Sequence, residues 1–155
     1  MFVLKLLIGV SSIIFSVKIG VDLAKKDKNA YQFFNSLINL CDKIISDLSY
    51  KKSNIDSLLS TKFQSIELND MLNNYVKNKK LVLPSFVSID ERFLIEDIFS
   101  SLGKVDSASQ IKNLEAYKIE LIKITNEKYE KYKKFNTLFI KLGFISGLLV
   151  FILVI

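Results

Sequence analysis

Two long apolar segments, one at each end of the chain, restrict the possible folds more than any other feature of the sequence. They cover residues 2–21 and 138–155. At 1.5 Å per helical residue, segments of this length measure about 30 and 27 Å, close to the thickness of the hydrocarbon core of a bilayer. We therefore predict transmembrane helices over residues 1–23 and 135–155, and one domain between them over residues 24–134.

Each apolar segment has an alternative interpretation. The first would be a cleaved signal peptide if small neutral residues preceded the cleavage site, but Asp22 and Ala24, before Lys25, fit that requirement poorly. The second would be the core helix of a soluble protein, but it carries no charge after Lys141. We therefore favour an uncleaved N-terminal anchor and a C-terminal span.

Lysines border both apolar segments on the side of the middle domain. These lysines are Lys25, Lys26, Lys28, Lys131, Lys133 and Lys134. By the positive-inside rule they predict that the middle domain is cytoplasmic. We also expect them to attract anionic membrane lipids. The net charge of +6 therefore does not require nucleic acid, and we predict no nucleic-acid partner.

Small residues recur at helical spacing in both apolar segments. They are Gly9, Ser12, Ser16 and Gly20 in the first segment, and Gly143 and Gly147 in the second. Stripes of small residues let helices approach closely in lipid. We predict that the two spans pack through these residues, or that they pack against another membrane subunit. Because such spacing is common in apolar segments, ordinary composition is an equal alternative.

The middle of the chain has the apolar periodicity of amphipathic helices. We expect helices over residues 27–48, 54–63, 66–76 and 88–102, and a last helix that begins near residue 106. One Pro and five Gly argue against a turn-rich all-β fold. The predicted fold class is all-α: an antiparallel helical bundle flanked by an N-terminal and a C-terminal transmembrane helix.

Several residues predict where these helices begin and end. Ser88 and Glu91 have the spacing of a capping box, and Gly103 stands where a glycine with positive φ would end a helix. Asp106 or Ser107 caps the last helix. Because no Gly or Pro interrupts this helix before the second apolar segment, we expect it to continue into that segment.

The periodicity also predicts which side chains face the core. In the first helix these are Ala30, Phe33, Phe34, Leu37, Ile38, Cys41, Ile44, Ile45 and Leu48. In the helix that follows Ser88 they are Ile89, Phe93, Leu94, Ile98 and Leu102. Cys41, the one cysteine, is therefore predicted to be a buried thiol.

The residue types that build active sites are scarce in this chain. There is no His, which removes His-based zinc sites and His-activated nucleophiles. No glycine-rich phosphate-binding loop is visible. Asp90, Glu91, Glu96 and Asp97 are close in sequence, but acidic residues are expected in the first turn of a helix. We predict no enzyme activity, and no catalytic, metal-binding or cofactor-binding residues.

The segment over residues 102–110 resembles the stage III sporulation protein AB family. The family pattern is Leu-Gly, a basic residue, a small residue and Asp, with Gln four positions later. The matching residues are Leu102, Gly103, Lys104, Asp106 and Gln110. Val105 departs from the pattern because a Ser is usual there. The N-terminal span, the helix after it and the chain length are also similar to the family, whereas residues 61–90 resemble it least.

This resemblance implies a structural role in endospore formation, within a channel complex between mother cell and forespore. It implies a cytoplasmic domain similar to those of the type II secretion F platform protein. The implied partners are the other stage III channel proteins, among them a cytoplasmic secretion-type ATPase. The implied location is the mother-cell membrane around the forespore. Residues 102–110 are then a candidate interface. A membrane-tethered regulatory adaptor for a soluble partner is the alternative, and a homo-oligomer stays open.

Overall fold

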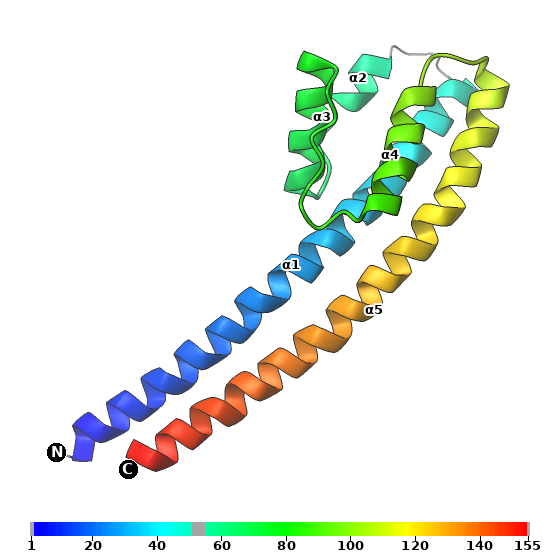
Figure 1. Cartoon of the computed structure of the whole chain (residues 1–155). Helices are drawn as coiled ribbons and strands as arrows, with labels where there is room; N and C mark the ends of the chain where they lie inside the picture. Colours follow the sequence, from blue (N-terminus) through cyan, green and yellow to red (C-terminus); the bar gives the residue numbers. More distant parts are fainter. Residues whose placement is uncertain (1, 51–54, 155) are drawn as a thin grey trace. The chain divides into compact units, whose positions relative to one another are not determined.

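The computed structural model describes the backbone of residues 2–50 and 55–154, which contain helices and no strand. It describes the side chains of residues 11, 14–16, 18–19, 21–22, 25–50, 57–149 and 152. The helices are α1 (Phe2–Tyr50), α2 (Ile55–Leu59), α3 (Ile66–Asn78), α4 (Ile89–Ser101) and α5 (Ser107–Val154) (Figure 1). The predicted all-α class is confirmed. The predicted start of α2 at Asn54 lies outside the described residues.

The chain forms two compact units. One unit consists of residues 1–28 and 128–155, and is called here the terminal unit. The other consists of residues 29–127, and is called the central unit. Helices α1 and α5 run through both units without a break, so the predicted continuation of α5 into the second apolar segment is confirmed.

The core of the central unit is built around the middle of α1. All the predicted inward side chains of this helix are buried or partly buried, as the periodicity predicts. Phe33 contacts the rings of Phe34 and Phe86 edge to face, with ring centroids 5.3 and 5.6 Å apart. The other helices contribute Leu58, Leu59, Leu68, Met71, Leu72, Ile95, Ile98, Phe99, Leu114 and Leu121. The predicted helical bundle therefore shares one core.

Helix α3 begins at a cap that also fixes it to α1. The backbone N–H of Leu68 donates to the Ser65 hydroxyl at 3.2 Å, and the Ser65 N–H donates to the hydroxyl of Ser36 on α1 at 3.2 Å. The helix ends at Lys79, whose φ is 53° and whose N–H donates to the Tyr75 carbonyl oxygen at 2.8 Å. The sequence-predicted break between α3 and α4 is confirmed.

Helix α4 begins with the predicted capping box, but its packed face is only partly the predicted one. The Ser88 N–H donates to Glu91 Oε2 at 2.8 Å, and the Glu91 N–H donates to Ser88 Oγ at 3.3 Å. The prediction that Ile89 and Phe93 face the core is wrong, because these side chains are 72% and 60% exposed. The prediction is confirmed for Ile98, which is buried, and for Leu94 and Leu102, which are partly buried. Ile95 and Phe99, which were not predicted to face inward, are buried beside them.

The terminal unit consists of the outer ends of α1 and α5, which run antiparallel. The hydroxyls of Ser16 and Ser146 lie 2.6 Å apart, and Lys131 Nζ lies 3.2 Å from a carboxylate oxygen of Asp27. The later residue of α1 thus contacts the earlier residue of α5, as in an antiparallel pair of helices. Gly143 and Gly147 are both buried in this unit. Gly9, Ser12 and Gly20 lie outside the described side chains.

Among the described residues, no helix has both the length and the apolar character that crossing a membrane requires. The transmembrane helices over residues 1–23 and 135–155 therefore stay predictions.

Candidate functional site

The turn between α4 and α5 holds most of the residues that the sequence singles out. Gly103 has φ 75°, so the predicted positive φ is confirmed. A side chain here would bring its Cβ close to the backbone, which explains a glycine at this position. The Lys104 N–H donates to the Ser101 carbonyl oxygen at 3.3 Å, which closes the end of α4.

Asp106 caps the N-terminus of α5. Its Oδ1 accepts a 3.0 Å hydrogen bond from the Ser109 backbone N–H, and its carbonyl oxygen accepts one of 2.9 Å from the Gln110 N–H. Hydrogen bonds from Ser109 lower the pKa of the Asp106 carboxyl below its usual value. Of the two predicted capping residues, Asp106 is therefore the one that caps.

Gln110 has a role that the sequence does not show. Its side chain is 2% exposed, and its Oε1 accepts a 3.2 Å hydrogen bond from the Gly103 N–H. Its Nε2 has no hydrogen-bond partner among the described atoms. The side chain thus reaches back across the turn and joins the end of α4 to the first turn of α5.

Comparison with known proteins assigns the chain to a family. Residues 66–155, more than half of the chain, match the stage III sporulation protein AB family. The chain belongs to this family. The matched range contains the whole turn over residues 102–110, as the resemblance implies. No curated protein and no solved structure matches the chain.

In this member of the stage III sporulation protein AB family, the motif residues divide into two groups. Gly103, Asp106 and Gln110 hold the turn together, and Leu102 packs partly against the core. Lys104 and Val105 are exposed, and Val105 replaces the Ser that the family pattern has. The hydrogen bonds of the turn therefore account for Gly103, Asp106 and Gln110, whereas Lys104 and Val105 are exposed and make no side-chain hydrogen bond among the described residues.

A second candidate surface lies on α4. Ile89 and Phe93 are one helical turn apart and exposed, and Asp90, Glu96, Asp97 and Arg92 are exposed on the same helix. Exposed apolar side chains within a charged rim, here mainly acidic, are typical of a surface that binds another protein. The apolar periodicity of α4 does not reveal this surface, because it places Ile89 and Phe93 in the core.

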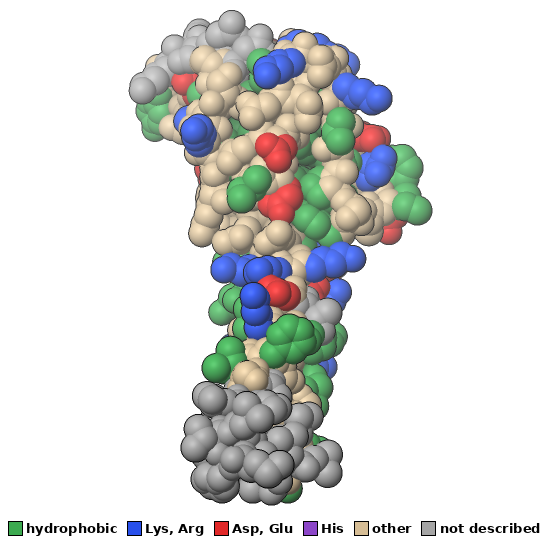
Figure 2. Space-filling view, turned by 90° about the vertical axis from the view of Figure 1, so that its left-hand side faces the viewer, with side chains coloured by type: hydrophobic (Ala, Val, Ile, Leu, Met, Phe, Trp, Pro, Cys, Tyr) green, Lys and Arg blue, Asp and Glu red, His purple; other side chains and the backbone are tan. Residues whose placement is uncertain are grey.

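The lysines next to the apolar segments are exposed in the terminal unit. All six are exposed to solvent. Figure 2 shows Lys and Arg side chains gathered beside hydrophobic ones. Two of them have acidic partners in the same unit: Lys25 lies 2.6 Å from Asp22, and Lys131 pairs with Asp27.

Cys41 is a buried thiol, as predicted, with no exposure to solvent. Burial raises its pKa to about 12, because the thiolate would lose its hydration. A thiol in this state is a poor nucleophile and a poor metal ligand. Within the described part of the chain, no group of His, Cys, Asp and Glu is placed to hold a metal ion. Whether the protein is an enzyme stays a matter of prediction.

Proposed function

We propose that this chain is a non-enzymatic membrane platform of the channel complex between mother cell and forespore, with a cytoplasmic central unit that docks a secretion-type ATPase. Family membership supports a role in stage III of sporulation. The two apolar termini and the lysines that border them support the membrane topology.

One observation carries the membrane part of the proposal. The end of α5 exposes a series of large apolar side chains to its surroundings. They are Leu138, Ile140, Leu142, Phe144, Ile145, Leu148, Leu149 and Ile152, at 37–68% exposure. Exposed apolar area of this extent is unusual in water and ordinary in lipid. Apart from Lys141, which is exposed among these residues, it follows the bordering lysines along α5, as expected of a helix that enters a bilayer.

The exposed surface of α4 supports the docking part. Ile89 and Phe93 lie outside the core and leave most of their side-chain surface exposed. A partner that covered them would bury apolar area at the centre of a mainly acidic rim. The complementary surface on the ATPase would be apolar and edged with basic residues. The alternative, a regulatory adaptor, would use the same surface for a different soluble partner.

Topology can be tested with a thiol reagent that does not cross membranes. The buried Cys41 should not react with the reagent, so the unmodified chain should give no labelling. A cysteine appended after Ile155 should react in intact vegetative cells that express the chain. Lys112→Cys, at an exposed position of the central unit, should react only after the cells are permeabilised. Labelling of Lys112→Cys in intact cells would contradict a cytoplasmic central unit.

Docking can be tested with the purified ATPase and the full chain in mild detergent. Ile89→Ser with Phe93→Ser should weaken binding by about tenfold or more, since central apolar residues carry most interface energy. The matched control is Ile119→Ser with Ile122→Ser on α5, at 71% and 41% exposure. Equal losses in both variants would exclude α4 as the docking surface. No binding by the unmodified chain would favour the adaptor.

A further inference from the structure

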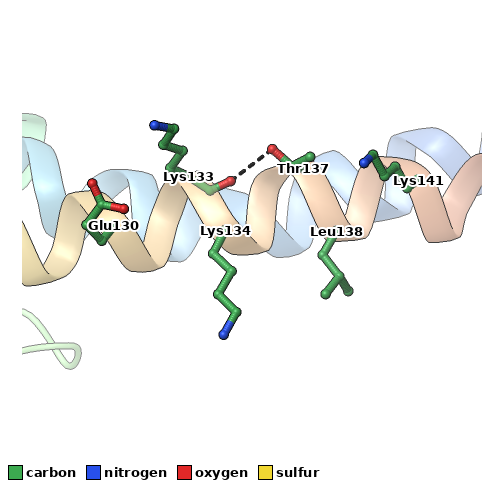
Figure 3. Close-up of a pocket in the computed structure, with 6 residues that line it drawn as sticks. All are labelled: Glu130, Lys133, Lys134, Thr137, Leu138 and Lys141. Atoms are coloured by element: carbon green, nitrogen blue, oxygen red, sulfur yellow. Dashed lines mark hydrogen bonds between the residues drawn. The ribbon is translucent and has the colours of Figure 1, made fainter.

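A two-part groove follows the outward face of α5 in the terminal unit. Its first part, about 550 Å³, is lined by Glu130, Lys133, Lys134, Thr137, Leu138 and Lys141 (Figure 3). The adjoining part, about 600 Å³, is lined by Ile140, Lys141, Phe144 and Ile145. Lys141 lines both parts, so the charged part of the groove adjoins the apolar part.

The lining residues lie on the side of α5 that is turned away from its packed face. They recur at spacings of three and four positions, which places them on one face of a helix. Gly143 and Gly147 are buried on the other side, whereas Phe144 and Ile145 are 52% and 56% exposed. The groove is therefore open to the surroundings of the terminal unit.

The lysines of the groove differ from Lys25 and Lys131 in their ion pairs. Lys25 and Lys131 are paired with Asp22 and Asp27, but no ion pair involves Lys133, Lys134 or Lys141 within the described residues. Figure 3 shows Lys133 and Lys134 leaving α5 on opposite sides, with Lys141 farther along the helix. Thr137 donates to the Lys133 carbonyl oxygen at 3.0 Å, so its hydroxyl proton is already used within the helix.

We propose that this groove binds one anionic phospholipid, with the headgroup in the charged part that Lys133, Lys134 and Lys141 line and an acyl chain along Phe144 and Ile145. Three ammonium groups against the single carboxylate of Glu130 select an anionic headgroup. The inference rests on the proposed membrane topology and adds to it a defined lipid site.

The length of the groove suits a site at the boundary between headgroups and hydrocarbon. From Lys133 to Lys141 the helix rises about 12 Å, a distance that the long side chains of the lysines can shorten by reaching toward one headgroup. From Lys141 to Ile145 it rises about 6 Å, so the apolar part of the groove would contact the beginning of an acyl chain.

The test measures lipid binding to the full chain in nonionic detergent by native mass spectrometry. Phosphatidylglycerol and phosphatidylcholine with the same acyl chains are compared. The unmodified chain should retain one phosphatidylglycerol with a preference of about tenfold or more, since each lysine near anionic lipid contributes substantially. Lys133→Gln, Lys134→Gln and Lys141→Gln together should abolish the preference. The control, Lys25→Gln, Lys26→Gln and Lys28→Gln together, should keep it.

Three results would overturn the site. Equal loss of the preference in both lysine variants would mean that charge attracts lipid without a defined groove. Retention of phosphatidylcholine as strong as that of phosphatidylglycerol would mean that the headgroup is not recognised. Displacement of the lipid by an equal concentration of glycerol phosphate would mean that the groove binds a free anion. Extraction of the unmodified chain from membranes by alkaline carbonate would overturn the membrane platform, and the detergent measurement would still report on the groove.

Discussion

The backbone N–H of Gly103 donates a hydrogen bond to Oε1 of Gln110 across a distance of 3.2 Å. This bond joins the residue that ends α4 to the first turn of α5, around the Asp106 cap. Three residues of the family motif thus stabilise one turn. Substitutions there should first change stability, and should change sporulation beyond that only if the turn also contacts a partner.

Replacing Gly103 tests the backbone requirement. Gly103→Ala should lower the free energy of unfolding by about 1–2 kcal/mol, because φ 75° brings a Cβ against the following carbonyl oxygen. The measurement is denaturant unfolding of the full chain in mild detergent, followed by helical circular dichroism. Lys104→Ala, at the exposed neighbouring position, should leave the midpoint nearly unchanged. Equal stability of the two variants would contradict the turn geometry.

Replacing Asp106 tests the helix cap through its pH dependence. The pKa of this carboxyl is lowered in the folded chain, so its contribution is complete above the ordinary pKa of about 4 and is lost as the pH falls through the folded pKa. Asp106→Ala should lower the unfolding midpoint at pH 7. Asp106→Asn, which keeps a capping oxygen without a titrating group, should stay close to the unmodified chain.

The same pair of Asp106 variants distinguishes the cap from a general charge effect. The difference between the unmodified chain and Asp106→Ala should shrink as the pH falls below about 4, because the protonated carboxyl is a weaker acceptor. A loss at pH 7 that was as large in Asp106→Asn as in Asp106→Ala would assign the effect to the charge.

Cys41 should be unreactive in the folded chain. Its burial and its pKa of about 12 predict no labelling by a maleimide at pH 8, and labelling of one thiol after denaturation. The raised pKa also predicts that stability falls as the pH rises above about 9, where the unfolded thiol ionises and the folded one does not. Cys41→Ala should lack this alkaline loss, and rapid labelling of the native chain would contradict the buried position.

The packing of α1 on α5 in the terminal unit can be tested by crosslinking. The 2.6 Å contact between the hydroxyls of Ser16 and Ser146 predicts that Ser16→Cys with Ser146→Cys forms an intramolecular disulfide on oxidation. Adding Gly143→Leu and Gly147→Leu should suppress the crosslink, because both glycines are buried and leucine would force the helices apart.

The control for this experiment places its changes on the outward face of α5. Ile145→Leu with Leu149→Ile, at positions 56% and 58% exposed, should leave crosslinking intact. Unchanged crosslinking in the double glycine variant would show that Gly143 and Gly147 are incidental to the packing.

Local sequence determined the helices and their ends. The capping residues Ser88 and Asp106 and the positive-φ Gly103 act within a few positions of themselves, so their roles are readable from short segments. The inward face of α1 was equally predictable, because one apolar stripe continues over five turns opposite polar residues. The family motif was recognisable for the same reason, since it lies within nine consecutive residues.

Only the tertiary structure decided which face of α4 packs and what Gln110 does. Helix α4 has apolar residues on two sides, Ile89 with Phe93 and Ile95 with Phe99, and its periodicity does not rank them. The side of α4 that packs is determined by the core, to which α1, α3 and α5 contribute residues from distant parts of the chain. The Gly103 N–H likewise reaches Oε1 of Gln110 only because the turn brings the end of α4 close to the first turn of α5. The apolar ends specify helices, and the burial of Gly143 and Gly147 depends on how those helices pack.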